Sequence, residues 1–181
     1  MPIFFTIVVL YFLLFFIIAR FIIPGLGFWE GKIPDKISRG MQQKIAELKA
    51  LSTSPSDFLN LTYDFLGGKY HAERLKTILK FNYLFMPLET VWLREGYLPC
   101  TQISYMTKIF LVKSGYFKEA EVRRKHTFVN FVLHQYLQVK IAGRWIDVDT
   151  GEKQRGLPIG KHLKYPKFES CISGLQPNVS T

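Results

Sequence analysis

The chain has 181 residues and carries 24 Lys and Arg against 14 Asp and Glu, which gives a formal net charge of +10 at pH 7. After an apolar N-terminal segment is set aside, this length suits one domain that can bury a core without disulfides or a metal. The two cysteines lie far apart in the sequence, and the four histidines show no HxxxH spacing, which excludes a disulfide scaffold and a structural zinc site.

The N-terminal segment MPIFFTIVVLYFLLFFIIARFIIP, residues 1–24, is apolar except for Arg20. At ~1.5 Å per residue, a helix of this length crosses a hydrocarbon core ~30 Å thick. A cleavable signal peptide would begin with basic residues and end at a small-residue cleavage site, and neither is present. The segment therefore predicts an uncleaved, single-pass transmembrane anchor. Basic residues follow it and none precedes it, so the positive-inside rule predicts that the rest of the chain faces the cytoplasm.

Three further regions are expected after the anchor. Residues 25–50 are interpreted as a juxtamembrane linker that ends in a short amphipathic helix, QQKIAELKAL. The main domain is predicted over residues 51–160, and residues 161–181 form a C-terminal tail. The domain opens with a helix whose start is marked by Ser54 and whose end is marked by Gly67.

Two more helices are indicated before the strands. One surrounds HAERLKTILKF, residues 71–81, and the other lies in TQISYMTKIFLVKSG, residues 101–115, where apolar residues recur at helical spacing. Cys100 follows Pro99 and lies at or just before the first turn of the second helix. The unpaired backbone N–H groups of a helix start would point toward its sulfur.

The C-terminal half of the domain changes to a strand-like pattern. The basic run EVRRKH at 121–126 is interpreted as a solvated loop. The segments TFVNFVLHQYLQVKI and RWIDVD are rich in β-branched and aromatic residues, and the Ala142-Gly143 pair between them indicates a hairpin. Helices followed by an antiparallel sheet predict an α+β fold.

The positive charge favours acidic partners or an anionic membrane surface. The basic residues are scattered along the chain, without a zinc finger, a recognition helix or a phosphate-binding loop, so nucleic-acid binding is not favoured. The sequence indicates no oligomeric state.

The predicted hairpin brings a histidine close to an aspartate. A two-residue turn at 142–143 places Tyr136 opposite Asp149, and His134 shares the same side of the sheet. His134 and Asp149 then become diagonal neighbours roughly 7 Å apart between backbones, within reach of their side chains. Asp147 points to the same side but lies two residues further along. Asp149 is therefore the predicted partner of His134, although a register shift of one residue would reverse its side.

A histidine oriented by a carboxylate can act as a general base if a nucleophile is near, and Cys100 is the best candidate in this chain. Cys100, His134 and Asp149 would form a complete catalytic triad. The backbone N–H of Cys100 would supply one donor to the oxyanion of an acyl-transfer intermediate.

The order of these residues resembles the transglutaminase-like superfamily of papain-type folds. The matching features are Cys100 at the start of a central helix, His134 on a strand, and the GRWIDVD segment that ends in Asp149. The resemblance covers about residues 54–150. It implies a membrane-anchored thiol enzyme that acts on peptide or glutamine-type amide bonds of a peptide or protein substrate, with no metal or organic cofactor. Water as the second substrate would make the enzyme a peptidase or amidase and an amine would make it a transferase, and hydrolysis is the expected reaction.

The alternative from another functional class is a catalytically inactive form of the same fold. Such a protein would be an interaction module tethered to the membrane, whose basic surface binds acidic partners or lipid headgroups. Cys171 lies in the tail without a helix or strand pattern and is interpreted as incidental.

Overall fold

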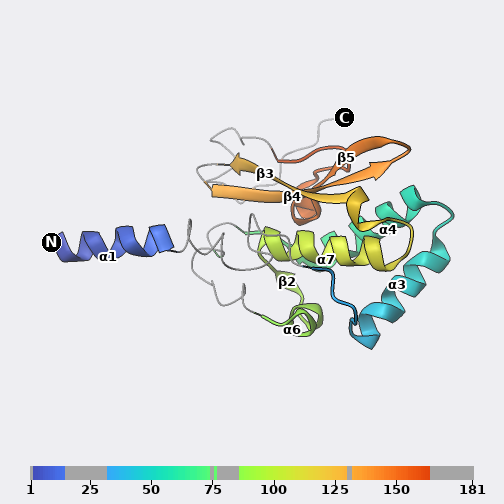
Figure 1. The fold of residues 1–181 in the computed structure, drawn as a ribbon, viewed down its shortest axis with the longest axis horizontal. Helices are drawn as coiled ribbons and strands as arrows, with labels where there is room; N and C mark the ends of the chain where they lie inside the picture. The colour runs from blue at the N-terminus through green and yellow to red at the C-terminus, as the bar shows by residue number, and fades with distance from the viewer. Residues whose placement is uncertain (1, 15–31, 74–75, 77–85, 130–131, 164–181) are drawn as a thin grey trace. The chain divides into compact units, whose positions relative to one another are not determined.

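The computed structural model describes residues 2–14, 32–73, 76, 86–129 and 132–163 (Figure 1). The chain divides into two compact units, Met1–Ile33 and Pro34–Thr181. The second unit contains all the strands found in the described residues and the whole of the predicted triad.

Helix α1, Pro2–Phe12, covers the first half of the predicted membrane anchor. Its large apolar side chains are exposed, as in Ile3, Phe4 and Phe5. None of the helices in the described part of the chain is both long enough and apolar enough to cross a membrane. Residues 15–24, the second half of the predicted anchor, lie outside the described residues.

Helix α3, Arg39–Leu51, opens the second unit. The Ser38 side chain caps it by accepting a hydrogen bond from Met41 N at 3.4 Å. Three apolar side chains at helical spacing, those of Met41, Ile45 and Leu48, are buried. The folded unit therefore begins at Pro34 and includes the helix that the sequence suggested as the end of a linker.

Helix α4, Pro55–Lys69, begins where the sequence predicts. Ser54 Oγ accepts a hydrogen bond from Asp57 N at 3.1 Å, which satisfies one of the unpaired amides of the first turn. The predicted end at Gly67 is wrong, because the helix continues to Lys69. A Cβ on Gly67 would lie 2.6 Å from Lys153 Cδ, so this glycine makes room for a packed side chain instead of ending the helix.

A short parallel pair of strands precedes the central helix. Strand β1, Tyr70–His71, pairs with β2, Gly96–Tyr97, and helix α6, Leu88–Leu93, lies between them in sequence. The helix predicted over residues 71–81 is replaced at its start by β1, and most of its remainder lies outside the described residues.

Helix α7, Cys100–Lys113, follows β2 directly and confirms that Cys100 lies in the first helical turn. The helix stops before Gly115, whose φ of +80° belongs to the left-handed region that glycine adopts without strain.

The second sheet has three antiparallel strands in the order β3-β4-β5: β3 is Val122–Val129, β4 is Val132–Ile141 and β5 is Arg144–Val148. Short 3₁₀ helices flank it, η3 over Glu119–Glu121 and η4 over Thr150–Arg155. The interpretation of residues 121–126 as a solvated loop is wrong, because Val122 begins β3 and the side chain of Arg124 is buried.

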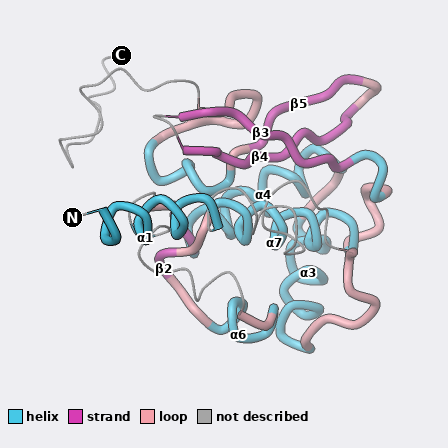
Figure 2. The backbone as a smooth tube through the Cα atoms, turned by 60° about the vertical axis from the view of Figure 1, so that its left-hand side comes forward, coloured by secondary structure: helices cyan, strands magenta, loops and turns pink. Residues whose placement is uncertain are grey.

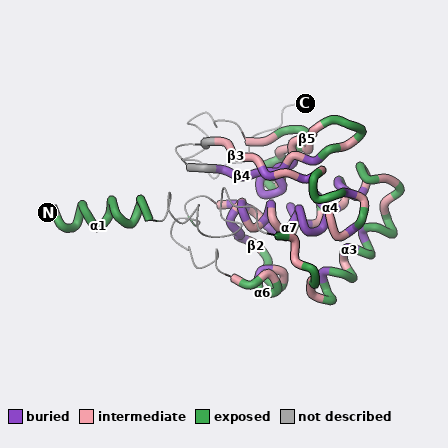
Figure 3. The backbone as a smooth tube through the Cα atoms, viewed as in Figure 1, coloured by how far each residue is buried: buried purple, intermediate pink, exposed green. Residues whose placement is uncertain are grey.

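The three-stranded sheet lies over one side of α7, and α4 runs beside α7 (Figures 1 and 2). The buried layer lies between the sheet and these two helices (Figure 3). It is formed mainly by the apolar side chains Phe58, Leu66, Ile103, Ile109, Phe110, Leu137 and Val139. The unit is therefore a mixed α+β fold, as the order of helices and strands predicts.

Candidate active site

Cys100 is held at the N-terminus of α7 by the strand that precedes it. Leu98 N donates to the carbonyl oxygen of His71 at 3.1 Å, and Leu98 is fully buried. Pro99 then turns the chain, with φ −58° and ψ 144°, into the helix that starts at the cysteine. Cys100 forms no disulfide, and the residue as a whole is half-buried. A thiol at this position lies close to the positive end of the helix dipole.

The β4–β5 hairpin has the register that the sequence predicts. Ala142 and Gly143 form the two-residue turn with φ of +47° and +81°, and Ile141 pairs with Arg144. The ladder continues to the pairing of Leu137 with Val148 and brings Asp149 to the end of β5.

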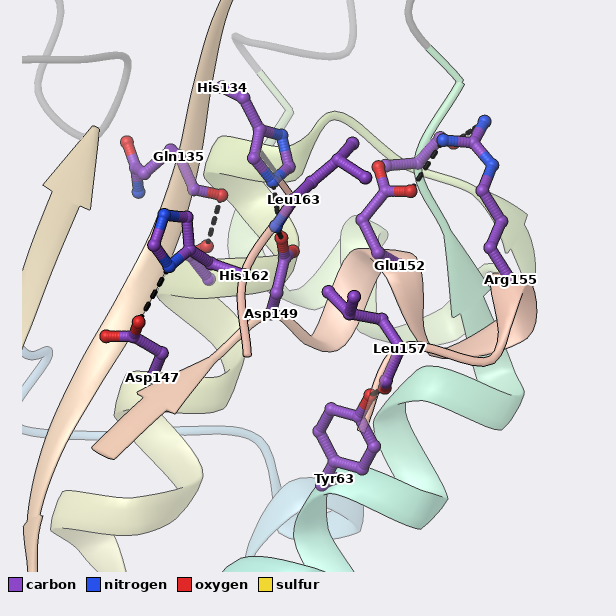
Figure 4. Close-up of polar contacts among 12 residues, drawn as sticks. Tyr63, His134, Gln135, Asp147, Asp149, Glu152, Arg155, Leu157, His162 and Leu163 are labelled. Carbon is purple, nitrogen blue, oxygen red and sulfur yellow. Dashed lines mark hydrogen bonds and ion pairs between the residues drawn. The ribbon is translucent and has the colours of Figure 1, made fainter. Parts of the chain in front are cut away.

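The side chains at the end of this hairpin meet as expected. His134 Nε2 lies 2.7 Å from Asp149 Oδ2, and both residues are almost fully buried (Figure 4). The prediction that Asp149 is the partner of His134 is confirmed. Because Nε2 is engaged by Asp149, Nδ1 is the ring nitrogen left for the thiol.

The histidine is strongly biased toward its protonated form. Burial disfavours the imidazolium, but hydrogen bonds to Asp149 and Cys100, with the charges of these groups, outweigh burial and raise the pKa of His134 to about 10. Burial alone would also raise the pKa of the Cys100 thiol. The hydrogen bond and the positive charge of His134, with a backbone hydrogen bond from Gln135, lower the Cys100 pKa below its usual value. The pair thus favours a thiolate beside an imidazolium.

The strand that carries His134 is tied to the helix that carries Cys100. Ser104, one turn further along α7, donates from Oγ to the carbonyl oxygen of Gln135 at 3.3 Å. Because Gln135 follows His134 directly, this bond fixes the separation of the two elements beside the thiol.

Asp149 has a second donor that sequence reasoning missed. Leu163 N donates to Asp149 Oδ2 at 3.1 Å, so the oxygen that binds His134 also accepts a backbone hydrogen bond (Figure 4). Leu163 belongs to the predicted C-terminal tail, and a backbone donor leaves no signal in the side-chain pattern. Residues 161–163 are therefore part of the site.

Asp147 binds a different histidine. Its Oδ1 accepts from Gln138 Nε2 at 2.7 Å, and its Oδ2 lies 2.6 Å from His162 Nδ1. The ring of His162 stacks on Tyr136, with centroids 4.2 Å apart and planes 2° from parallel. The strand alternation places Gln138 and Asp147 opposite each other, but it gave no indication of His162.

Two other features lie near the site. His71 Nε2 lies 2.9 Å from Glu73 Oε1, a contact that no sequence pattern indicates. A second buried carboxylate, Glu152, is one turn beyond Asp149 and forms an ion pair with Arg155 at 2.5 Å. Within the described residues, no group of three or more His, Cys, Asp or Glu side chains is arranged to hold a metal ion.

Comparison with protein-family models, with curated proteins and with solved structures gave no match for this chain. The function is therefore inferred from the geometry of Cys100, His134 and Asp149 themselves.

Proposed function

We propose that the protein is a membrane-anchored thiol enzyme of the transglutaminase-like class that hydrolyses peptide or glutamine-type amide bonds. The observation that carries the proposal is the buried His134–Asp149 hydrogen bond of 2.7 Å, combined with a Cys100 thiol whose pKa is lowered by His134. A structural histidine needs no such arrangement, whereas a nucleophilic cysteine does.

The reaction follows from the roles that these groups can fill. The Cys100 thiolate attacks the substrate carbonyl and forms a tetrahedral intermediate, and the Cys100 backbone N–H at the start of α7 can donate to the oxyanion. The imidazolium of His134 transfers its proton to the leaving amine as the C–N bond breaks and the thioester forms. Water, deprotonated by His134, then attacks the thioester and releases the acid. Asp149 orients the ring throughout.

The substrate is proposed to be a peptide or protein, and the enzyme requires no metal or organic cofactor. We propose that residues 1–24 anchor the enzyme as a single-pass protein with the folded unit in the cytoplasm. The exposed apolar side chains of α1 and the basic residues that follow the anchor in sequence support this arrangement.

The proposal is tested on the full chain in detergent, with Cys171 replaced by serine so that Cys100 is the only thiol. We expect iodoacetamide to alkylate Cys100 at neutral pH faster than it alkylates a cysteine peptide, because more of the thiol is ionised. His134→Ala should remove this advantage. A nitrophenyl ester should acylate Cys100, and mass spectrometry should detect the thioester.

Substitution at each triad position should separate the roles. Cys100→Ala should abolish acylation, and His134→Ala should slow it by about 10²-fold or more, the usual contribution of a general base. His126→Ala serves as the matched histidine control, because His126 lies on β3 outside the triad. If Cys100 reacts like a cysteine peptide and His134→Ala changes nothing, the protein is the inactive, tethered interaction module instead.

The acceptor is identified in the same assay. Loss of the thioester in water alone indicates a hydrolase. If the thioester persists until an alkyl amine is added and the amide is then recovered, the enzyme is a transferase and the proposed hydrolysis is wrong.

A further inference from the structure

We propose that His162 is a positioning residue for the triad. By binding Asp147 it fixes residues 158–163, here called the strap, so that the Leu163 N–H holds Asp149 against His134. This inference rests on the proposed function, because it concerns how the triad is kept in order.

The strap is attached to β5 at more than one point. Gly160 N donates to the carbonyl oxygen of Asp147 at 2.8 Å, and His162 Nδ1 lies 2.6 Å from the Asp147 carboxylate. Leu163 N then reaches Asp149 Oδ2 at 3.1 Å. The strap therefore contacts Asp147 on β5 and Asp149 just after β5. It connects Asp147, which binds His162, to Asp149, which binds His134 (Figure 4).

The ring of His162 is fixed in both distance and orientation. The side chains of His162 and Asp147 are only 15% and 19% exposed, so water competes weakly for their hydrogen bond. Stacking on Tyr136 fixes the plane of the ring, since the two planes are 2° from parallel. A ring constrained in this way limits the movement of Leu163, the next residue along the chain.

Asp147 is itself restrained from the other side. Gln138 donates from Nε2 to Asp147 Oδ1 at 2.7 Å, while Gln138 Oε1 accepts from Arg123 Nε and Nη2 at 3.1 and 2.9 Å. The Arg123 guanidinium lies 3.8 Å from the ring centroid of Trp145. Both carboxylate oxygens of Asp147 therefore have partners, and the carboxylate is a firm anchor for His162.

The Leu163 donor matters because Asp149 is 2% exposed and must remain a carboxylate acceptor in a buried place. A buried carboxylate is stabilised by each hydrogen bond it accepts, and it loses its fixed orientation when a donor is withdrawn. A less fixed Asp149 would hold His134 less well, and a less well-held imidazolium would stabilise the Cys100 thiolate less. The effect of the strap should thus be measurable at the thiol.

The test uses the full chain with Cys171→Ser and measures the alkylation rate of Cys100 across a range of pH. His162→Phe retains a ring over Tyr136 but loses the donor to Asp147. His162→Asn places an amide N–H near the position of Nδ1. Lys161→Ala is the control within the strap, because that side chain is exposed.

We expect His162→Phe to slow alkylation at neutral pH by about three- to tenfold, the effect of losing one well-formed hydrogen bond, and to move the acid limb of the profile to higher pH. His162→Asn should recover most of the rate, and Lys161→Ala should match the parent. The downfield proton resonance of His134 Nε2–H should shift in His162→Phe and return in His162→Asn.

A second pair of variants tests the backbone donor directly. Leu163→Pro removes the N–H, whereas Leu163→Ala removes the side chain and keeps the N–H. We expect a slower reaction in Leu163→Pro and a parental rate in Leu163→Ala. Equal losses in both variants would mean that the side chain acts through packing and would overturn the inference. Circular dichroism identifies any variant that fails to fold. In that case the alkylation rate of His162→Asn, which keeps a donor to Asp147, tests the inference.

The failure of this inference can be distinguished from the failure of the proposed function. If His134→Ala removes the thiol activation while His162→Phe leaves both the rate and the His134 resonance unchanged, the strap has no positioning role and the enzyme proposal stands. If the parent thiol is not activated at all, the proposed function fails and the inference fails with it.

Discussion

The pKa of Cys100 depends mainly on the balance between burial and the neighbouring imidazole of His134. Burial disfavours the thiolate, and the lowered pKa of Cys100 comes from the hydrogen bond and the charge of His134. The same interaction, with the hydrogen bond to Asp149, raises the pKa of His134. Each group therefore needs the other to be charged, and loss of either should return its partner toward an uncharged, buried state.

These directions predict the pH dependence of Cys100 ionisation. The thiolate should form as pH rises through the lowered pKa of Cys100, so below the usual thiol pKa a larger fraction of Cys100 than of a free cysteine should be ionised. Ultraviolet absorbance of the thiolate, measured against a Cys100→Ser variant, records this transition. In His134→Gln the transition should move to higher pH, because burial remains and the positive charge is gone.

At alkaline pH, turnover and alkylation should respond differently, because turnover needs the His134 general acid and alkylation needs only the Cys100 thiolate. As pH rises through about 10, His134 loses its proton, so ester and amide turnover that depends on the imidazolium should fall. Alkylation of Cys100 should not fall there, because the thiolate persists. If Cys100 of the parent protein ionises at the same pH as a cysteine peptide, Cys100 and His134 do not form a thiolate–imidazolium pair.

At the scale of elements, the hairpin of β4 and β5 determines which aspartate meets His134. The pairing of Ile141 with Arg144 propagates to the end of β5, and a shift of one residue would turn Asp149 to the opposite face of the sheet. The turn at Ala142 and Gly143 is therefore part of the geometry of the site, although it lies at the far end of the two strands.

The turn also carries backbone strain that can be measured. Ala142 has a φ of +47°, which costs a non-glycine residue about 1 kcal/mol, whereas Gly143 at +81° has no such cost. We expect Ala142→Asn to stabilise the protein by about 0.5 kcal/mol, because asparagine tolerates this conformation. Gly143→Ala should destabilise it by about 1 kcal/mol. Urea unfolding of the two variants measures both changes.

The surroundings of Gly143 make this pair of substitutions informative. A Cβ at Gly143 would have no neighbour within 4 Å, so any loss of stability in Gly143→Ala reflects the backbone alone. A stabilising effect of Gly143→Ala would indicate a different turn, and would put the register of the hairpin in doubt.

The sequence predicted correctly the features that depend on contacts between residues close in the chain. The cap at Ser54 and the turn at 142–143 depend on residues within a few positions, and both are found as expected. The first part of β3, residues 122–126, was interpreted as a loop because its basic residues are stabilised across the sheet, where Arg123 binds Gln138. His162 was missed because it lies beyond the strands, where no strand register indicates which side chain faces Asp147.

At the scale of the whole molecule, the chain combines a folded α+β unit with an apolar N-terminal segment. The folded unit begins at Pro34, and α1 of the first unit exposes its apolar side chains. Arg20 is the only charged side chain among residues 1–24, so the basic character of the protein lies almost entirely in the remaining chain. In the proposed orientation, the basic domain would be attracted to the anionic cytoplasmic leaflet, and the proposed nucleophile Cys100 would meet substrates near the membrane.

This arrangement predicts how the protein divides between membrane and solution. The full chain should stay with the membrane pellet after alkaline carbonate extraction, whereas a chain that lacks residues 1–24 should move to the supernatant.

Leu13→Arg should weaken insertion, since an arginine near the centre of a span costs about 2.5–3.5 kcal/mol on insertion scales. Arg20→Leu is the matched control and should not weaken it, because a charge near the end of the span can reach the interface. Since the folded unit starts after the deleted segment, the shortened chain should keep the alkylation rate of Cys100. Recovery of the full chain in the supernatant would show that residues 1–24 do not anchor it.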